Sequence, residues 1–166
     1  DTAEYVEITG KGENQTNMQV QLAAISNPEK QTKFENCVAD VNIPLGEVFT
    51  SPKLAGTNGI LNVGTVYIGD IQYRNLRMEF KDGRVVSAVC DNFVENGVID
   101  QEAGHRLIVQ GIMNGHETLP LGEFAIGTNT TAYAMAEKFG ILDRLPILIV
   151  EKMGPHFAVG DTCYSW

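Results

Sequence analysis

The chain has 166 residues, 43% of them hydrophobic and 20% charged, which excludes a disordered or low-complexity protein and suffices for one domain with a core. Its formal net charge of -9 is opposite in sign to the charge that nucleic-acid backbones and anionic membrane surfaces attract. The longest apolar run, Leu145–Val150, is far too short to span a bilayer. We therefore expect neither nucleic acid nor a membrane as a partner.

Extended structure is predicted for the first third of the chain. Tyr5–Ile8 is apolar-rich, and apolar residues at 18, 20 and 22 recur at the period of two that is typical of a strand. A brief extended piece at Gly46–Thr50 lies between two prolines, Pro44 and Pro52. These patterns indicate short strands separated by turns.

The middle of the chain carries the clearest pattern of paired strands. Ile60–Ile68 and Ile71–Phe80 are predicted to be neighbouring strands, joined at Gly69-Asp70. The sequence Lys81-Asp82-Gly83 predicts a hairpin turn that leads into a further strand at Val85–Cys90. We expect these segments to form a meander.

Beyond Asp91 the alternation stops, and the apolar residues between 94 and 112 predict one or two amphipathic helices, with glycines at 104 and 111. Further on, the pattern predicts a helix at Ala132–Phe139 and strands at Leu121–Ile126, Leu145–Val150 and His156–Val159. The predicted class is therefore α+β, dominated by strands, with a few short helices.

Three cysteines, at 37, 90 and 163, are an odd number without a Cys-x-x-Cys pair. This pattern argues against a disulfide framework and against a cysteine-built zinc site. It favours a reducing, cytoplasmic compartment.

Carboxylates stand in apolar, glycine-containing segments at three places. Glu47 follows Gly46, Glu123 follows Gly122, and Glu151 ends an apolar run shortly before His156. Glutamate is rarely buried unless it is paired or binds a metal ion, so these residues are candidate ligands of a divalent metal. The alternative is that each glutamate is a solvated residue at a strand end and that His156 is an ordinary hydrogen-bonded histidine.

Other catalytic patterns are weaker. The sequence has no Gly-x-Ser-x-Gly elbow and no His-Glu-x-x-His pair. A cysteine-protease pairing of Cys163 with His156 is conceivable, but nothing marks this thiol as reactive. His105 is expected at the surface, and Glu117 is a chemical possibility as a general base.

Three blocks of this sequence resemble the aminopeptidase T/aminopeptidase S family of metallopeptidases, which includes leucyl aminopeptidases. The blocks are Asn42-Ile-Pro-Leu-Gly-Glu-Val-Phe-Thr-Ser-Pro52, Leu121-Gly-Glu-Phe-Ala-Ile-Gly-Thr-Asn129 and Glu151-Lys-Met-Gly-Pro-His-Phe-Ala-Val-Gly160. They occur in the order of the family and extend across most of the chain.

The resemblance implies an enzyme that removes N-terminal residues from peptides with two divalent metal ions, which could be zinc, cobalt, magnesium or manganese. Glu47, Glu123, Glu151 and His156 fall on metal-ligand positions, and Tyr164 matches a catalytic tyrosine, one residue further from the histidine than in the commonest spacing. Family members are thought to form homodimers.

The resemblance also implies that residues 1–166 are part of a catalytic domain, without the family's N-terminal domain and without its C-terminal His-x-Asp ligand pair. The start at Asp1 and the abrupt end at Trp166 agree with this expectation. Such a piece alone is expected to be inactive. The competing hypotheses are a non-catalytic folding or dimerisation module and an inactive relative of the family.

Overall fold

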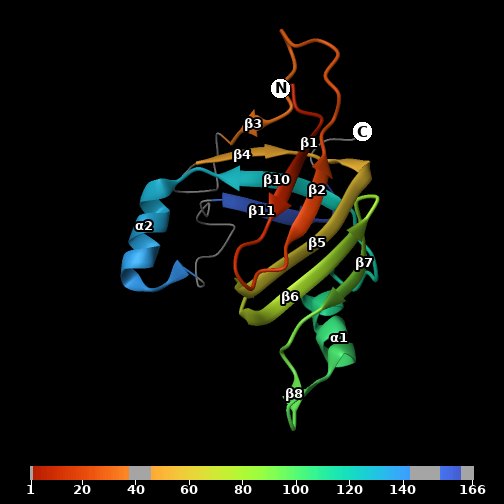
Figure 1. Ribbon diagram of the computed structural model, residues 1–166, viewed down its shortest axis with the longest axis vertical. Helices are drawn as coiled ribbons and strands as arrows, with labels where there is room; N and C mark the ends of the chain where they lie inside the picture. Colours follow the sequence, from red (N-terminus) through yellow and green to blue (C-terminus); the bar gives the residue numbers. More distant parts are fainter. Residues whose placement is uncertain (1, 38–45, 143–153, 162–166) are drawn as a thin grey trace.

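Two antiparallel sheets pack against each other in the computed structural model, which describes residues 2–37, 46–142 and 154–161 (Figure 1). The larger sheet has the strand order β1-β2-β5-β6-β7. Its strands are Tyr5–Thr9 (β1), Asn17–Gln21 (β2), Lys53–Ile68 (β5), Ile71–Lys81 (β6) and Arg84–Val89 (β7). The predicted α+β class with dominant strands is confirmed.

The smaller sheet has the order β11-β10-β4-β3 and joins segments from distant parts of the chain. Its strands are Glu35–Asn36 (β3), Glu47–Thr50 (β4), Leu121–Gly127 (β10) and Gly154–Val159 (β11). β4 leads almost directly into β5, so that one short connection links the two sheets. The predicted strand at Leu145–Val150 lies outside the described residues.

The core lies between the sheets and is formed by alternate residues of their facing strands. Tyr73 and Phe80 of β6 and Met18 of β2 are almost completely buried in it. The smaller sheet contributes Phe124, whose ring lies 5.3 Å from that of Phe157. Burying such side chains stabilises the fold by about 1.5–3 kcal/mol each and fixes which face of the smaller sheet points inward.

Helix α1, Gln101–Gly111, begins at Asp100, whose side chain accepts a hydrogen bond from the Ala103 N–H at 2.9 Å. Its two glycines allow it to lie directly on the larger sheet. A Cβ at Gly104 would lie 2.5 Å from the Cys90 carbonyl oxygen, and one at Gly111 would lie 2.1 Å from the Tyr73 hydroxyl. The two glycines are present because the helix packs this closely on the sheet. They do not interrupt the helix, which is continuous over Gln101–Gly111.

The prediction of helix from residue 94 onward is wrong for its first part. Val94–Glu95 (β8) and Val98–Ile99 (β9) form a small hairpin instead. Its turn residues, Asn96 and Gly97, have φ values of 51° and 78°, as in the two-residue turn that Asn-Gly favours. This local preference overrides the helical spacing of the apolar residues, which are largely exposed on the hairpin.

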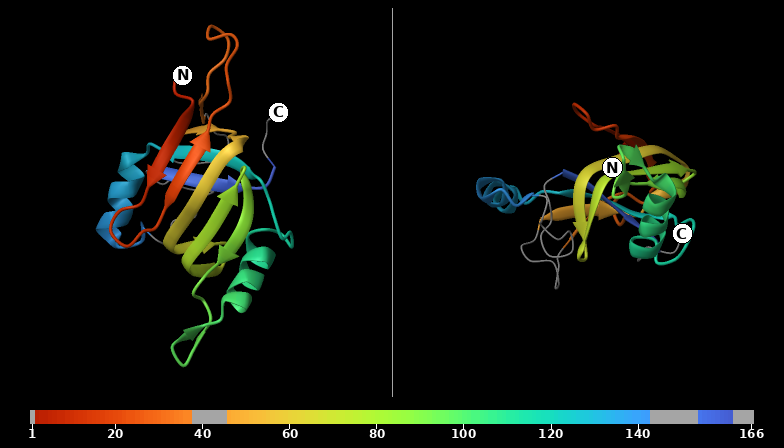
Figure 2. Two further views of the ribbon diagram at one scale, coloured as in Figure 1. Left: turned by 45° about the vertical axis from the view of Figure 1, so that its right-hand side comes forward. Right: turned by 90° about the horizontal axis from the view of Figure 1, so that it is seen from below.

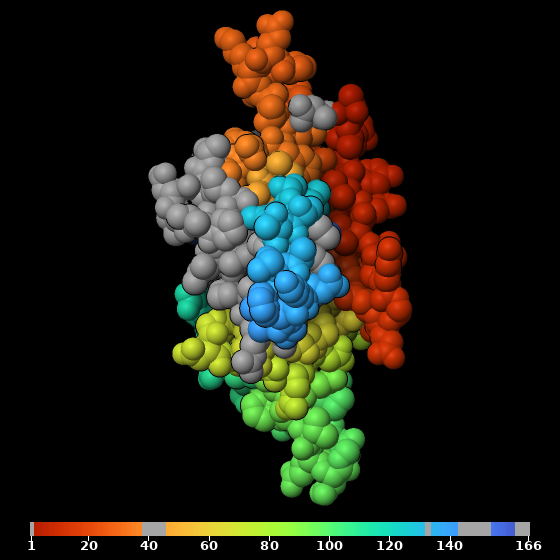
Figure 3. Space-filling view, turned by 90° about the vertical axis from the view of Figure 1, so that its left-hand side faces the viewer, coloured from red at the N-terminus to blue at the C-terminus, as the bar shows by residue number. Residues whose placement is uncertain are grey.

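Three parts project from the packed sheets. Helix α2, Thr130–Phe139, extends to one side (Figures 1 and 2). In the space-filling view the β8–β9 hairpin, in green, protrudes at one end and the segment after β2, in orange, at the other (Figure 3). Neither helix in the part of the chain that the structure describes has the length and apolar character to cross a bilayer.

Candidate metal centre

Three adjacent strands of the smaller sheet bring Glu47, Glu123 and His156 together. Glu47 is the first residue of β4, Glu123 lies in β10 and His156 lies in β11. β10 runs between the other two strands and pairs with both. Residues separated by more than 100 positions in the sequence therefore become neighbours on one sheet.

Strand pairing places these side chains on one face of the sheet, which we call the ligand face. Ala125 lies directly opposite His156 on one side and Phe49 on the other, and directly paired side chains share a face. Glu123 is two residues from Ala125 and Glu47 two residues from Phe49, so both carboxylates lie on this face as well. The opposite face carries Phe124 and its core contacts.

A β-bulge at Gly122 explains how Glu123 comes to this face. Leu121 pairs with Val159 and Glu123 with Ala158, so β10 has one residue more than β11 between these pairs. Leu121 and Glu123 are two positions apart and would share a face in a regular strand. The bulge lets Leu121 enter the core, where it is 1% exposed, while Glu123 lies on the ligand face.

Gly46 fixes the backbone just before Glu47. It has a φ of +142°, which favours glycine, and a Cβ here would lie 3.0 Å from the Cβ of Asn129. Its carbonyl oxygen accepts a hydrogen bond from the Thr128 N–H at 2.6 Å. The start of β4 is thus held against the segment that enters α2.

The three side chains are close and mostly shielded from solvent. His156 Nε2 lies 2.6 Å from Glu47 Oε2, with side-chain exposures of 12% and 6%. One donor atom from each of Glu47, Glu123 and His156 lies within 4.8 Å of the other two. At 2.6 Å the imidazole nitrogen is within hydrogen-bonding distance of the carboxylate, and this contact partly offsets the cost of burying the Glu47 charge.

The donor set fits a divalent cation. Zinc binds imidazole nitrogen and carboxylate oxygen at ~2.0–2.2 Å, so two donors of one ion are at most ~4.4 Å apart. The observed separations, within 4.8 Å, are close to this range. Two carboxylates and one imidazole suit zinc, cobalt or manganese and supply the negative charge that holds such an ion.

Of the other residues singled out in the sequence, two lie apart from this cluster and three are not described by the structure. Glu151, Cys163 and Tyr164 lie outside the described residues. His105 and Glu117 form a separate pair, in which His105 Nε2 lies 3.1 Å from Glu117 Oε2. Glu117 is therefore engaged beside α1 and not among the three clustered donors.

Two buried groups on or beside the larger sheet, the Tyr73 hydroxyl and the Cys90 thiol, do not offer a competing nucleophile. Burial raises the pKa of the Cys90 thiol and that of the Tyr73 hydroxyl. A buried thiol with a raised pKa stays protonated near neutral pH and is unreactive. The chemistry of the described residues is therefore concentrated at the carboxylate–histidine cluster.

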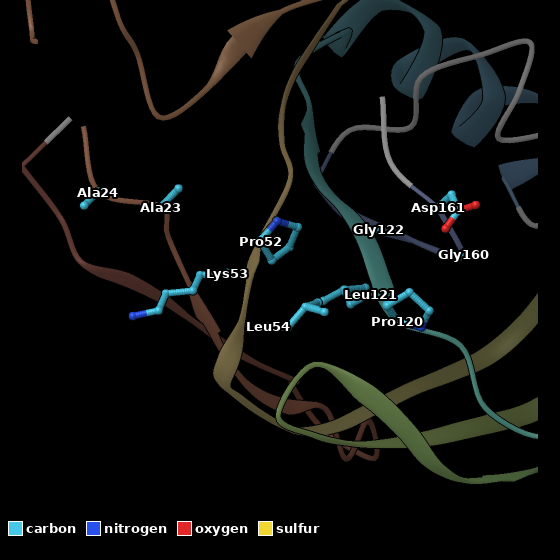
Figure 4. Close-up of a pocket in the computed structure, with 10 residues that line it drawn as sticks. All are labelled: Ala23, Ala24, Pro52, Lys53, Leu54, Pro120, Leu121, Gly122, Gly160 and Asp161. Carbon is cyan, nitrogen blue, oxygen red and sulfur yellow. The ribbon is translucent and has the colours of Figure 1, made fainter. Parts of the chain in front are cut away.

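A pocket of about 570 Å³ lies where the same three strands meet the larger sheet, a feature that the sequence does not reveal (Figure 4). Pro52 lines it just after β4, Gly122 lines it from β10, and Gly160 lines it just after β11. Most of the remaining wall is apolar, with Lys53 and Asp161 as its charged members. Gly122 directly precedes Glu123, so the pocket borders the strand that carries this carboxylate.

A family model and a solved structure are similar to this chain. No curated protein matches the chain. A solved structure, wild-type AmpT from Thermus thermophilus, matches with 19% sequence identity and a TM-score of 0.42, covering 70% of this chain and 27% of that one. This chain thus spans about a quarter of the length of that protein. The model of the family described as thermophilic metalloprotease (M29) matches residues 1–164, and the chain therefore belongs to this metallopeptidase family.

Proposed function

We propose that this chain forms part of a metal-dependent aminopeptidase, which hydrolyses N-terminal residues from peptides with two divalent ions. The observation that carries the proposal is the convergence of Glu47, Glu123 and His156 within 4.8 Å on three adjacent strands of a chain from a metalloprotease family. The sequence blocks that contain these residues are also those that resemble aminopeptidases.

The three side chains would hold the cation and set its surroundings. Glu47 and Glu123 supply negative charge in a mostly buried setting, where the attraction between a carboxylate and a cation is stronger than in water. His156 supplies a neutral nitrogen, and its contact with Glu47 keeps both donors oriented toward one point. When bound, paired divalent ions would lower the pKa of a water molecule and polarise the scissile carbonyl.

Two further residues enter the proposal from the resemblance. Glu151 would add a third carboxylate, which matters because one carboxylate can bridge two cations. The hydroxyl of Tyr164 would donate a hydrogen bond to the oxygen that gains charge during hydrolysis, a contribution on the order of 3 kcal/mol for such donors.

The substrate, the partner and the compartment also belong to the proposal. Peptides are the substrates that the family resemblance supports, and the mostly apolar pocket borders β10, the strand that carries Glu123. The resemblance supports a homodimer. The odd number of cysteines, without a Cys-x-x-Cys pair, supports a reducing, cytoplasmic compartment.

Replacement of a carboxylate oxygen in the cluster tests the proposed function. We expect Glu123→Gln in the complete protein to lower peptide hydrolysis by at least about 100-fold, since losing a ligand costs more than losing its hydrogen-bond partner. Glu79→Gln is the matched control, because Glu79 is an exposed strand glutamate of the other sheet. The rate of leucine-p-nitroanilide hydrolysis and the bound metal per chain are measured together.

The outcomes separate the proposal from its alternatives. A loss of both activity and metal in Glu123→Gln, with a normal Glu79→Gln, supports the aminopeptidase. Full activity with full metal content in Glu123→Gln would contradict the role of Glu123. A wild-type protein that binds no divalent ion would instead favour a non-catalytic module or an inactive relative.

A further inference from the structure

Ala125 occupies the middle of the ligand face. It lies directly opposite His156 on β11, it is two residues from Glu123 in its own strand, and the pair two positions further along β10 joins Gly127 to Glu47. The three clustered donors thus belong to positions that surround Ala125. Directly opposed side chains in a sheet have Cβ atoms about 4.5–5.5 Å apart, so the His156 side chain begins next to the Ala125 methyl group, with the two glutamates at flanking positions of the same face.

Burial agrees with this placement. Ala125 is 0% exposed, although the core of the protein lies against the other face of β10. The cover over its methyl group therefore comes from neighbours on the ligand face, which include the His156 ring and the half-buried Phe49. The three donors, which lie within 4.8 Å of one another, extend from positions that surround this methyl group on the same face.

We infer that Ala125 is a positioning residue, whose small side chain leaves the room that a cation needs between Glu47, Glu123 and His156. The inference rests on the proposed metal-dependent function. A β-branched residue at this position would put two additional methyl groups among donors that already lie within 4.8 Å of one another. The donors would be forced apart without the loss of any ligand.

The test compares two buried alanines in strands. Ala125→Val changes the ligand face, and Ala88→Val makes the same change at a residue of β7 that is 1% exposed and packs in the core. For each variant of the complete protein, prepared free of metal, the free energy of unfolding in urea and the dissociation constant for Mn²⁺ by calorimetry are measured. Ala125→Gly and Ala125→Ser complete the series.

We expect both valine variants to lose stability, because overpacking a well-packed site is unfavourable. Only Ala125→Val should weaken Mn²⁺ binding, by at least about tenfold, as when the surroundings of a metal ligand are disturbed. The dissociation constant for Mn²⁺ should stay within about twofold of the wild-type value in Ala88→Val and within about threefold in Ala125→Gly. If Ala125→Val does not fold, Ala125→Ser should still bind Mn²⁺ more weakly than Ala125→Gly.

Wild-type Mn²⁺ affinity in Ala125→Val, or equal losses in the two valine variants, would overturn the inference. In the absence of a folded valine variant, equal affinities of Ala125→Ser and Ala125→Gly would overturn it too. Each of these results leaves the proposed function intact, because the wild type still binds the ion. A wild type that does not bind Mn²⁺ or zinc contradicts the proposed function, and the inference falls with it.

Discussion

Small residues determine where the carboxylates of the candidate metal centre lie. Gly46 holds the backbone before Glu47 against Asn129, and Gly122 forms the bulge before Glu123. Glycine is required at position 122 because there is no space for a side chain. A Cβ there would lie 2.5 Å from the Gly160 carbonyl oxygen and 2.9 Å from that of Asp161. Neither oxygen can move without shifting the backbone that follows β11.

A pair of glycine substitutions tests this role of Gly122. Gly122→Ala and Gly104→Ala both place a Cβ 2.5 Å from a backbone oxygen, but only Gly122 adjoins a candidate ligand. We expect both variants to be destabilised by about 1–3 kcal/mol, even though alanine normally stabilises a helix relative to glycine at position 104. Only Gly122→Ala should also weaken zinc binding. Unfolding in urea and zinc calorimetry measure the two effects, and unchanged zinc affinity in Gly122→Ala would show that the bulge does not orient Glu123.

At the scale of elements, α1 is attached to the larger sheet by a histidine as well as by apolar packing. His105 Nδ1 lies 2.9 Å from the Ala88 carbonyl oxygen and Nε2 lies 3.1 Å from Glu117 Oε2. Both partners are acceptors, so the imidazole donates from both nitrogens only when it is protonated. Both hydrogen bonds therefore raise the pKa of His105, and the bond to Ala88 has the larger effect.

The stability that His105 contributes should accordingly depend on pH. A folded-state pKa above the unfolded value of about 6.5 gives a contribution that is complete below that value and is lost as the pH rises through the raised pKa. The pair is partly exposed, so we expect less than about 1 kcal/mol. His105→Asn should therefore destabilise the protein more at pH 5.5 than at pH 8.5 in urea unfolding. His116→Asn, at an exposed histidine, is the control, and an equal loss from His105→Asn at both pH values would refute the charged form.

The sequence predicts those elements whose partners are near in the chain. β5, β6 and β7 follow from alternation and from the turn at Asp82-Gly83, because each strand pairs with the next. The small hairpin after residue 93 was predictable from Asn96-Gly97, although the helical spacing of valines and isoleucines pointed to a helix. Local turn chemistry was the better guide there.

The candidate centre could not be predicted from local patterns alone. β4 pairs with β10, more than 70 positions further on, and nothing within either segment specifies this partner. The sequence blocks of the resembling family named Glu47, Glu123 and His156, whereas the bulge at Gly122 and the place of Ala125 required the strand register. A single inserted residue changes the face of every side chain beyond it, and alternation within one strand does not reveal it.

At the scale of the whole molecule, the two sheets have different tasks. The larger sheet, closed at one end by α1, provides most of the core, and the smaller sheet buries one face against it and carries the three donors on the other (Figures 1 and 2). The donors thus rest on strands that core packing holds rigid. A rigid support suits a metal site, because the geometry of its ligands must be kept within narrow limits.

The central claim is that Glu47, Glu123 and His156 hold a divalent ion. The most direct measurement is anomalous diffraction from crystals of the complete protein grown with zinc, with data collected above and below the zinc absorption edge. The account predicts an anomalous peak ~2.0–2.2 Å from a carboxylate oxygen of each glutamate and from a ring nitrogen of His156. Zinc bound only elsewhere, with His156 Nε2 still 2.6 Å from Glu47 Oε2, would contradict it.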